Sequence, residues 1–212
     1  MHKSLVIAVD GPAASGKGTL AKRLAEYFHL PHLDTGCLYR ATALRVISGG
    51  YEPTDTAAAA SAAQSITADD LANDALRSEH IGQAASIVSA IPEVRAALLK
   101  YQQDFAAQPG GAVLDGRDIG TVIAPHAAVK IFITASYEAR ATRRVKQLEG
   151  FGTTANYATI LADIKARDLR DASRAIAPLA PAADAHVIDT SALNADQVFA
   201  KAFKLIGTLP TP

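Results

Sequence analysis

Residues 11–19 read Gly11-Pro12-Ala13-Ala14-Ser15-Gly16-Lys17-Gly18-Thr19, and the segments on either side of them indicate the type of fold. An apolar run, residues 5–9, leads in through Asp10, and a helix-compatible run, residues 20–28, follows. A strand, a glycine-bounded loop with a lysine and then a helix is the arrangement of a phosphate-binding loop. Glycines let backbone N–H groups approach a polyanion, and the helix adds unpaired N–H groups and the positive end of its dipole. We expect this loop to bind phosphates, with Lys17 supplying a full charge at the β- and γ-phosphates.

The end of the loop departs from the general motif. Ser or Thr usually follows the lysine directly, whereas here Gly18 intervenes and Thr19 comes next. An alternative interpretation is a glycine-rich turn with an incidental lysine. The phosphate-binding loop is favoured because the flanking strand and helix both lie where the motif requires them.

The composition is typical of one soluble α/β domain. The chain has 212 residues, 49% of them apolar, and a formal net charge of zero, so no overall field favours nucleic acid or an anionic membrane. A single cysteine, Cys37, excludes an intramolecular disulfide framework and a cysteine-rich zinc site. No apolar stretch is long enough for a signal-peptide core or a membrane span. We expect a cytoplasmic monomer that binds neither nucleic acid nor a membrane.

The apolar pattern predicts alternating strands and helices, and therefore a mainly parallel sheet wrapped by helices. Strands are expected at residues 4–9, 30–33, 112–114, 129–134 and 186–189. Helices are expected at residues 20–28, 38–46, 81–90, 93–105, 137–148, 157–169 and 195–206. Residues 53–80 are rich in Ala, Ser, Thr and Asp, and we expect a peripheral, partly helical segment with little core of its own.

Polar residues follow each predicted strand. Ligands of open parallel sheets bind beyond the carboxyl ends of the strands. The polar strand ends are Asp10-Gly11, Asp34-Thr35-Gly36, Asp115-Gly116-Arg117-Asp118, Thr134 and Asp189-Thr190. If the second and third predicted strands flank the first, Thr35, Arg40, Arg117 and Asp118 surround a second ligand that faces the bound nucleotide. Asp115 is the candidate for a water-mediated contact to nucleotide-bound Mg²⁺.

Arginines indicate the class of reaction. Phosphoryl transfer needs positive charge along the path of the transferred group. Residues 167–174 hold three arginines, and Arg167, Arg170, Asp171 and Arg174 fall on one helical face. A solvated face of ion pairs is the alternative to a mobile lid, and the nearby phosphate-binding loop favours the lid. For a second cluster, Arg140, Arg143 and Arg144, a solvated face and lid support both remain open.

Other polar residues have structural interpretations. Asp10 and Asp189 are expected to serve capping or loop geometry. Cys37 is expected to be a small residue at a helix start, because no activating histidine is near it in sequence. The six histidines form no metal-ligand spacing.

Together these motifs resemble the bacterial cytidylate kinases, which belong to the nucleoside monophosphate kinase group. The matching blocks are residues 7–19, 34–40, 84–89, 94–95, 115–122 and 167–181, in the order of that family. The Asp-Gly-Arg-Asp block and the lid that ends in Ala-Pro-Leu are more specific than the phosphate-binding loop. The Lys17-Gly18-Thr19 ending is also similar to this kinase group.

The resemblance implies an ATP-dependent kinase that phosphorylates CMP and dCMP to the diphosphates, with ATP as donor and Mg²⁺ as cofactor. It implies a three-layer P-loop kinase fold with a small acceptor-binding insertion and an arginine-rich lid. We expect a single domain over residues 1–212, with the core in residues 1–52, 91–139 and 181–212. The insertion then covers residues 53–90, and the lid region covers residues 140–180.

The resemblance also implies roles for individual residues. Residues 11–19 hold the ATP phosphates, and Thr19 and Asp115 hold the metal. The acceptor phosphate is bound by Arg40, Arg117 and Arg174, with Thr35 and Gly116 close by. The cytosine edge is read by Ser86, Arg95 and Asp118, and the sugar is contacted by Arg167 and Asp171. The residues expected to act in catalysis are Lys17, Arg167, Arg170 and Arg174.

Two features depart from the family. The insertion is short and alanine-rich where relatives carry strand-rich segments, and Thr35 stands where Ser is common. Two other functions also remain open. One is a kinase for another small acceptor, such as UMP, AMP or a non-nucleotide metabolite. The other is a regulatory module that binds ATP without turnover, and the arginine-rich lid argues against it.

Overall fold

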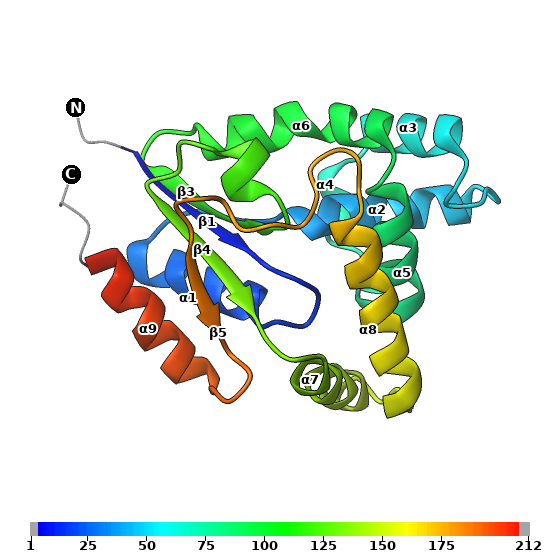
Figure 1. Ribbon diagram of the computed structural model, residues 1–212. Coiled ribbons are helices and arrows are strands. Elements are labelled where there is room, and N and C mark those ends of the chain that lie inside the picture. The colour runs from blue at the N-terminus through cyan, green and yellow to red at the C-terminus, as the bar shows by residue number, and fades with distance from the viewer. Residues whose placement is uncertain (1–3, 208–212) are drawn as a thin grey trace.

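The centre of the molecule is a parallel sheet of five strands in the order β2-β3-β1-β4-β5. The structure, a computed structural model, describes residues 4–207; residues 1–3 and 208–212 of the expected domain lie outside the described residues. The strands are β1 (Leu5–Asp10), β2 (His32–Asp34), β3 (Gly111–Gly116), β4 (Val129–Thr134) and β5 (His186–Asp189). All neighbouring strands pair in parallel, so the predicted strands and sheet type are confirmed (Figure 1).

Helices connect the strands and surround the sheet. The longer ones are α1 (Lys17–Phe28), α2 (Thr35–Ser48), α3 (Thr56–Gln64), α5 (Glu79–Val88), α6 (Pro92–Ala106), α7 (Tyr137–Gly150), α8 (Tyr157–Ala172) and α9 (Ala195–Gly207). Three short segments have no counterpart in the prediction: α4 (Ala68–Leu71), the 3₁₀ turn η1 (Asp74–Arg77) and the π-helical turn η2 (Ile119–Ile123). Among residues 4–207, no helix is both long and apolar enough to cross a membrane.

The sheet is the middle of three layers (Figure 1). On one face, apolar side chains of β1 and β4 pack against Leu20 and Leu24 of α1 and Val198 of α9. On the other face, Ala8 and Leu114 pack with η2 and α6. A central strand buried on both faces explains the nearly continuous apolar run at residues 5–9.

Helix α3 of the insertion packs mainly through small residues. Ala59 and Ala63 of α3 enter a buried cluster whose larger side chains come from α2, α5 and α6, among them Leu38 and Leu98. Small side chains allow helices to approach closely but bury little apolar area of their own. The alanine-rich α3 therefore depends on its neighbours for its core, whereas Leu76 and Ile81 of the same insertion are buried large side chains that the sequence did not predict.

The lid helix is longer than the predicted 157–169, but it does not reach Arg174. α8 stops at Ala172, so Arg174 lies beyond it rather than on one helical face with Arg167, Arg170 and Asp171. The chain reverses there, since Ala177 is left-handed with φ 51° and the Leu179 N–H donates to the Asp171 carbonyl at 2.8 Å. The following strap, residues 173–185, leads back to β5, and the buried Lys130 of β4 holds it by an ion pair to Asp184 at 2.8 Å.

The Asp10 side chain joins the end of β1 to the start of η2 by hydrogen bonds. Its two carboxylate oxygens accept hydrogen bonds from the Ile119 and Gly120 N–H groups, each at 2.8 Å. The side chain is buried, so no water replaces these bonds if they are lost. The loop-geometry role predicted for Asp10 agrees with these contacts.

We expect Asp10→Asn to lower the free energy of unfolding by about 1–3 kcal/mol, because the amide nitrogen would face a backbone N–H and leave it unpaired. Urea denaturation followed by circular dichroism measures the change. Asp189→Asn is the matched control, since this strand-end carboxylate is exposed and accepts hydrogen bonds from neighbouring Ser191. Equal stability of the Asp10→Asn and wild-type proteins would contradict the prediction.

Candidate active site

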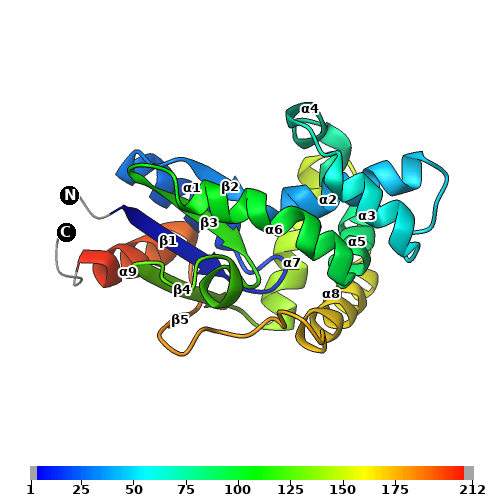
Figure 2. The ribbon, with the colours of Figure 1, turned by 90° about the horizontal axis from the view of Figure 1, so that it is seen from above.

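Three strand ends bring the predicted site residues together. β1 lies between β3 and β4, and β2 lies beside β3, so the phosphate-binding loop, Asp34 and Asp115 share one edge of the sheet. Viewed from above, the helices of the insertion and the lid lie beyond this edge (Figure 2). The predicted juxtaposition of a donor loop with acceptor residues follows from this strand order.

The phosphate-binding loop is fixed by close backbone packing. A Cβ on Gly11, whose φ is +152°, would lie 2.2 Å from the carbonyl oxygen of Ile133. Gly16 is left-handed, with φ 93°, at the N-cap of α1. These two conformations favour glycine and aim the chain into the first turn of α1, whose N–H groups suit an anion.

The second arginine cluster supports the loop and the lid. Arg140 is 2% exposed; it donates to the Ala13 carbonyl at 3.1 Å and pairs with Asp168 of α8. Arg143 donates to the Ser15 carbonyl at 3.3 Å, and Arg144 pairs with Glu79 of the insertion at 2.7 Å. These contacts favour support of the loop and of α8 over a solvated face for this cluster, and a mobile lid stays a prediction.

Lys17 lies beside a buried carboxylate. Its Nζ is 3.6 Å from Asp115 Oδ2, and His32 Nε2 is 2.8 Å from the other oxygen of Asp115. Burial, with the nearby Arg117, lowers the pKa of Lys17 to about 8. His32 has no motif around it in the sequence, so sequence reasoning missed it.

Thr35 and Gly116 fit together at the base of the site. The Thr35 hydroxyl donates to the Asp115 carbonyl at 2.8 Å, and a Cβ on Gly116 would lie 2.5 Å from the same hydroxyl. Gly116 is therefore needed for space. Thr35 begins α2, which also carries Arg40; the Arg40 guanidinium pairs with Asp34 at 2.8 Å.

Cations gather around a small cavity. Lys17, Arg40, Arg117, Arg167 and Arg174 all line a space of about 120 Å³. Within residues 4–207, the Nε atoms of Arg167 and Arg174 are buried without a hydrogen-bond partner. Burial, with the nearby Arg117, lowers the pKa of Arg167 to about 10. Buried donors without partners beside other cations are the features of a site for an anionic ligand.

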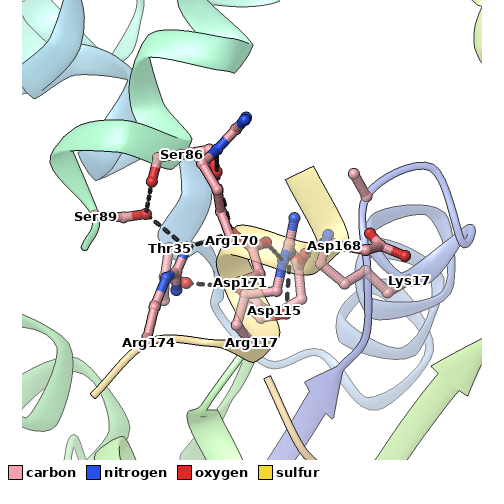
Figure 3. A network of polar contacts seen from close by, with 12 residues as sticks. Lys17, Thr35, Ser86, Ser89, Asp115, Arg117, Asp168, Arg170, Asp171 and Arg174 are labelled. Atoms are coloured by element: carbon pink, nitrogen blue, oxygen red, sulfur yellow. Dashed lines mark hydrogen bonds and ion pairs between the residues drawn. The ribbon is translucent and has the colours of Figure 1, made fainter. Parts of the chain in front are cut away.

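Asp171 is the central acceptor of this cluster (Figure 3). One oxygen accepts from Ser86 Oγ at 3.1 Å and from Arg174 Nη2 at 2.5 Å, while the other accepts from Arg117 Nε at 3.0 Å. Ser86 comes from α5 and Asp171 from α8, so the contact joins the insertion to the lid.

Arg95 and Asp118 form a second buried unit. They pair directly with each other, and Arg95 Nη1 also donates to the Ser89 carbonyl at 3.4 Å. The Ser89 hydroxyl accepts from Arg174 Nη2 at 2.7 Å. Ser89 therefore links Arg95 to Arg174, yet sequence reasoning missed it because only the nearby Ser86 has a role in the family pattern.

Two predicted site residues, Arg170 and Thr19, do not line the small cavity. Arg170 donates to Gln83 Oε1 at 2.8 Å and to Ser86 Oγ at 3.3 Å, both on α5, and its catalytic role stays a prediction. Thr19 lines a separate cavity with Ser15 and Thr190. The loop residue beside Asp115 is instead Gly18, because a Cβ on Gly18 would lie 3.7 Å from Asp115 Oδ2. Among residues 4–207, no group of three or more His, Cys, Asp or Glu is placed to hold a metal.

Cys37 has no sign of reactivity. Its thiol donates to Asp34 at 3.4 Å, and Arg40 lies 2.8 Å from the sulfur. Burial, followed by the effect of Asp34, raises the pKa of Cys37 to about 11, so the thiolate is not formed near neutral pH.

Comparisons with known proteins identify the family of the chain. The family model described as Cytidylate kinase matches residues 7–208. The cytidylate kinase of Methylocella silvestris is 58% identical over 95% of this chain and 94% of its own length. That of Paramagnetospirillum magneticum is 55% identical over 97% and 99%. An uncharacterized protein from Eubacterium ventriosum has a similar fold, with a TM-score of 0.59 at 16% identity over 97% of this chain and 99% of that one. The chain belongs to the cytidylate kinase family.

Proposed function

We propose that the protein transfers the γ-phosphoryl group of ATP to CMP or dCMP, giving ADP and the diphosphate. The observation that carries the proposal is the cluster of partly buried cations, two of them with buried Nε donors that have no partner among residues 4–207, between the phosphate-binding loop and the Arg95–Asp118 pair. Family membership supports the choice of substrates.

On the donor side, residues 11–19 and Lys17 would bind the phosphates of ATP. Mg²⁺ bound to ATP neutralises phosphate charge during transfer. The Asp115 carboxylate beside the loop fits this ion, because Mg²⁺ in such sites uses one or two carboxylates together with water and phosphates. We infer that Asp115 holds it, with Thr19 as the second candidate.

On the acceptor side, Arg40, Arg117 and Arg174 would bind the phosphate of CMP, with Thr35 close by. Two anionic substrates repel each other, so cations must lie along the in-line path between them. Arg167 lines both the small cavity and the larger one, of about 680 Å³, that opens towards Ala13 of the donor loop. This position suits a cation that contacts the transferred group.

The base would be read by Arg95 and Asp118, with Ser86 nearby. Cytosine presents an exocyclic amine donor beside ring-nitrogen and carbonyl acceptors. The Asp118 carboxylate would accept from the amine, and Arg95 would donate to the acceptors. Uracil reverses this pattern at two positions and would leave buried groups unpaired.

We infer a cytoplasmic monomer. All residues of the proposed donor and acceptor sites belong to one chain, so a second subunit is not needed to complete them. The free Cys37 thiol is compatible with a reducing compartment.

A coupled assay of ADP release with CMP, dCMP, UMP, AMP and GMP tests the acceptor. We expect kcat/KM for CMP and dCMP to exceed that for the others by about a hundredfold or more, because unpaired buried polar groups are costly. A preference for UMP or AMP would overturn the substrate assignment. No turnover with any acceptor would favour the regulatory module.

Asp118→Asn tests the reading of the base. The amide keeps the shape of the side chain but removes the carboxylate acceptor, so the ratio of kcat/KM for CMP over UMP should fall by about tenfold or more. Asp104→Asn, which alters an exposed pair with Lys100, is the matched control. An unchanged ratio in a folded Asp118→Asn protein would rule out the contact.

The lowered pKa of Lys17 predicts that ATP binds more weakly at high pH. Above about pH 8 the free protein loses the Lys17 proton, whereas bound phosphates favour the charged form, so binding there requires proton uptake. We expect the Kd for ATP to rise by up to about tenfold per pH unit above that value. Calorimetry between pH 7 and 9.5 measures it.

Lys17→Ala provides the control for the pH experiment. It should bind ATP weakly, with no such pH dependence, and lower kcat by about a hundredfold or more. The same pH dependence in wild type and Lys17→Ala would exclude Lys17 as its source.

A further inference from the structure

The Ser89 hydroxyl joins the side chain of Arg174 to the end of α5. Ser89 is 5% exposed and is the C-cap residue of α5, where its N–H donates to the Ala85 carbonyl at 3.0 Å. Its hydroxyl donates to the Ser86 carbonyl at 3.0 Å and accepts from Arg174 Nη2 at 2.7 Å (Figure 3). The hydroxyl proton is thus used within α5, and the oxygen is left to accept from the guanidinium.

Two acceptors on one nitrogen fix the orientation of the Arg174 guanidinium. Nη2 carries two hydrogens, and its acceptors are Ser89 Oγ and Asp171 Oδ1, the latter at 2.5 Å. Asp171 lies three residues earlier on the same segment, whereas Ser89 comes from α5. With Asp171 alone, the guanidinium could turn about a single hydrogen bond. Ser89 therefore determines the direction of the Arg174 Nε, which is buried without a partner among residues 4–207.

Nearby positive charges act against this arrangement. Burial lowers the pKa of Arg174, and the charges of Arg117 and Arg95 lower it further, whereas Asp171 raises it. Like charges repel, so Arg174 needs acceptors that hold it at the wall of the cavity. A second carboxylate in place of Ser89 would hold the guanidinium but would also repel a phosphate. The hydroxyl is a neutral acceptor and adds no negative charge to a site for an anion.

We propose that Ser89 is a positioning residue for the acceptor phosphate, because its hydroxyl holds Arg174 at the small cavity with the Nε free to donate. The inference rests on the proposed function for the role of Arg174. The Ser89 carbonyl has a separate partner, Arg95 Nη1 at 3.4 Å, and every substitution keeps that carbonyl. The hydroxyl therefore acts on the phosphate of the acceptor and not on its base.

Ser89→Ala removes the hydroxyl alone, and alanine fits in the space of serine, so the fold is retained; circular dichroism checks it. The Kd for CMP, measured by a nuclear magnetic resonance titration without ATP, should rise about fivefold, because a hydrogen bond from a charged donor is lost. In turnover, kcat/KM for CMP and for UMP should fall by the same factor, and KM for ATP should stay within about twofold of wild type. An unchanged or lower Kd for CMP would overturn the proposal, and so would a changed ratio of CMP to UMP.

Ser65→Ala is the matched control. Ser65 is the C-cap residue of α3, and its hydroxyl donates to the Ala62 carbonyl at 3.1 Å and accepts from Arg45 Nη1 at 2.7 Å. The local geometry is the same, but Ser65 does not line the small cavity. The Kd for CMP should stay within about twofold of wild type. An equal rise in Ser65→Ala would overturn the proposal, because the effect would then come from a weakened helix end in the insertion.

A double-mutant cycle with Arg174→Ala distinguishes positioning from a structural role. In the Arg174→Ala protein, Ser89→Ala should change the Kd for CMP by less than about twofold, because the guanidinium that the hydroxyl orients is absent. A further fivefold rise there would overturn the proposal. Wild-type affinity of Arg174→Ala would contradict the acceptor site of the proposed function, and this inference with it. Wild-type affinity of Ser89→Ala beside weak binding by Arg174→Ala would contradict this inference alone.

Discussion

Repulsion among partly buried cations is the constraint on which this site depends. Lys17, Arg40, Arg117, Arg167 and Arg174 border one cavity, and like charges that are partly shielded from water repel more strongly than charges in solvent. Carboxylates balance them: Asp115 for Lys17, Asp34 for Arg40, and Asp171 for both Arg117 and Arg174. The Arg167 Nε stays unpaired among the described residues, and the pKa of Arg167 is lowered. The protein thus folds with most of these charges balanced by its own carboxylates.

The same pairing holds the parts of the molecule together. Arg140 joins the donor loop to α8, Arg144 joins α7 to the insertion, and Arg170 joins α8 to α5. The acceptor cavity of about 120 Å³ is below the range of about 300–1,000 Å³ typical of ligand pockets. If an acceptor binds in this cavity, as proposed, the lid and the insertion have to move apart to admit it, and these arginine contacts oppose that movement.

The sequence predicts most of this fold because its signals are local. Apolar runs and glycine-bounded turns mark the five strands, and the phosphate-binding loop is identified by a short motif. What it does not predict depends on distant residues. The end of α8 before Arg174 is set by a turn in which Leu179 bonds back to Asp171. The roles of Ser89 and His32 arise from partners brought close by the sheet and the lid, and no neighbouring residue marks them.

The sequence predicts which residues line the cavity better than it predicts which of them contact each other. The family blocks predict acceptor roles for Arg117, Arg174 and Asp171, and in the structure these residues line one cavity, while their roles stay predictions. Nothing in the sequence shows that Asp171 bonds to both arginines, since residue 117 is far along the chain from residues 171 and 174. Ion pairs between residues far apart in the sequence can be identified only when the fold is known.

The ion pair between Lys130 and Asp184 limits how the lid can travel. Lys130 is fixed in a central strand, and Asp184 lies at the far end of the strap that follows α8. At its other end the lid starts from the carboxyl end of β4, at α7. Both ends of residues 137–184 are thus anchored to the same strand of the sheet. A segment held to one strand at both ends would favour rotation about that strand over release into solvent, and the exposed Asp184 makes the ion pair the weaker of the two attachments.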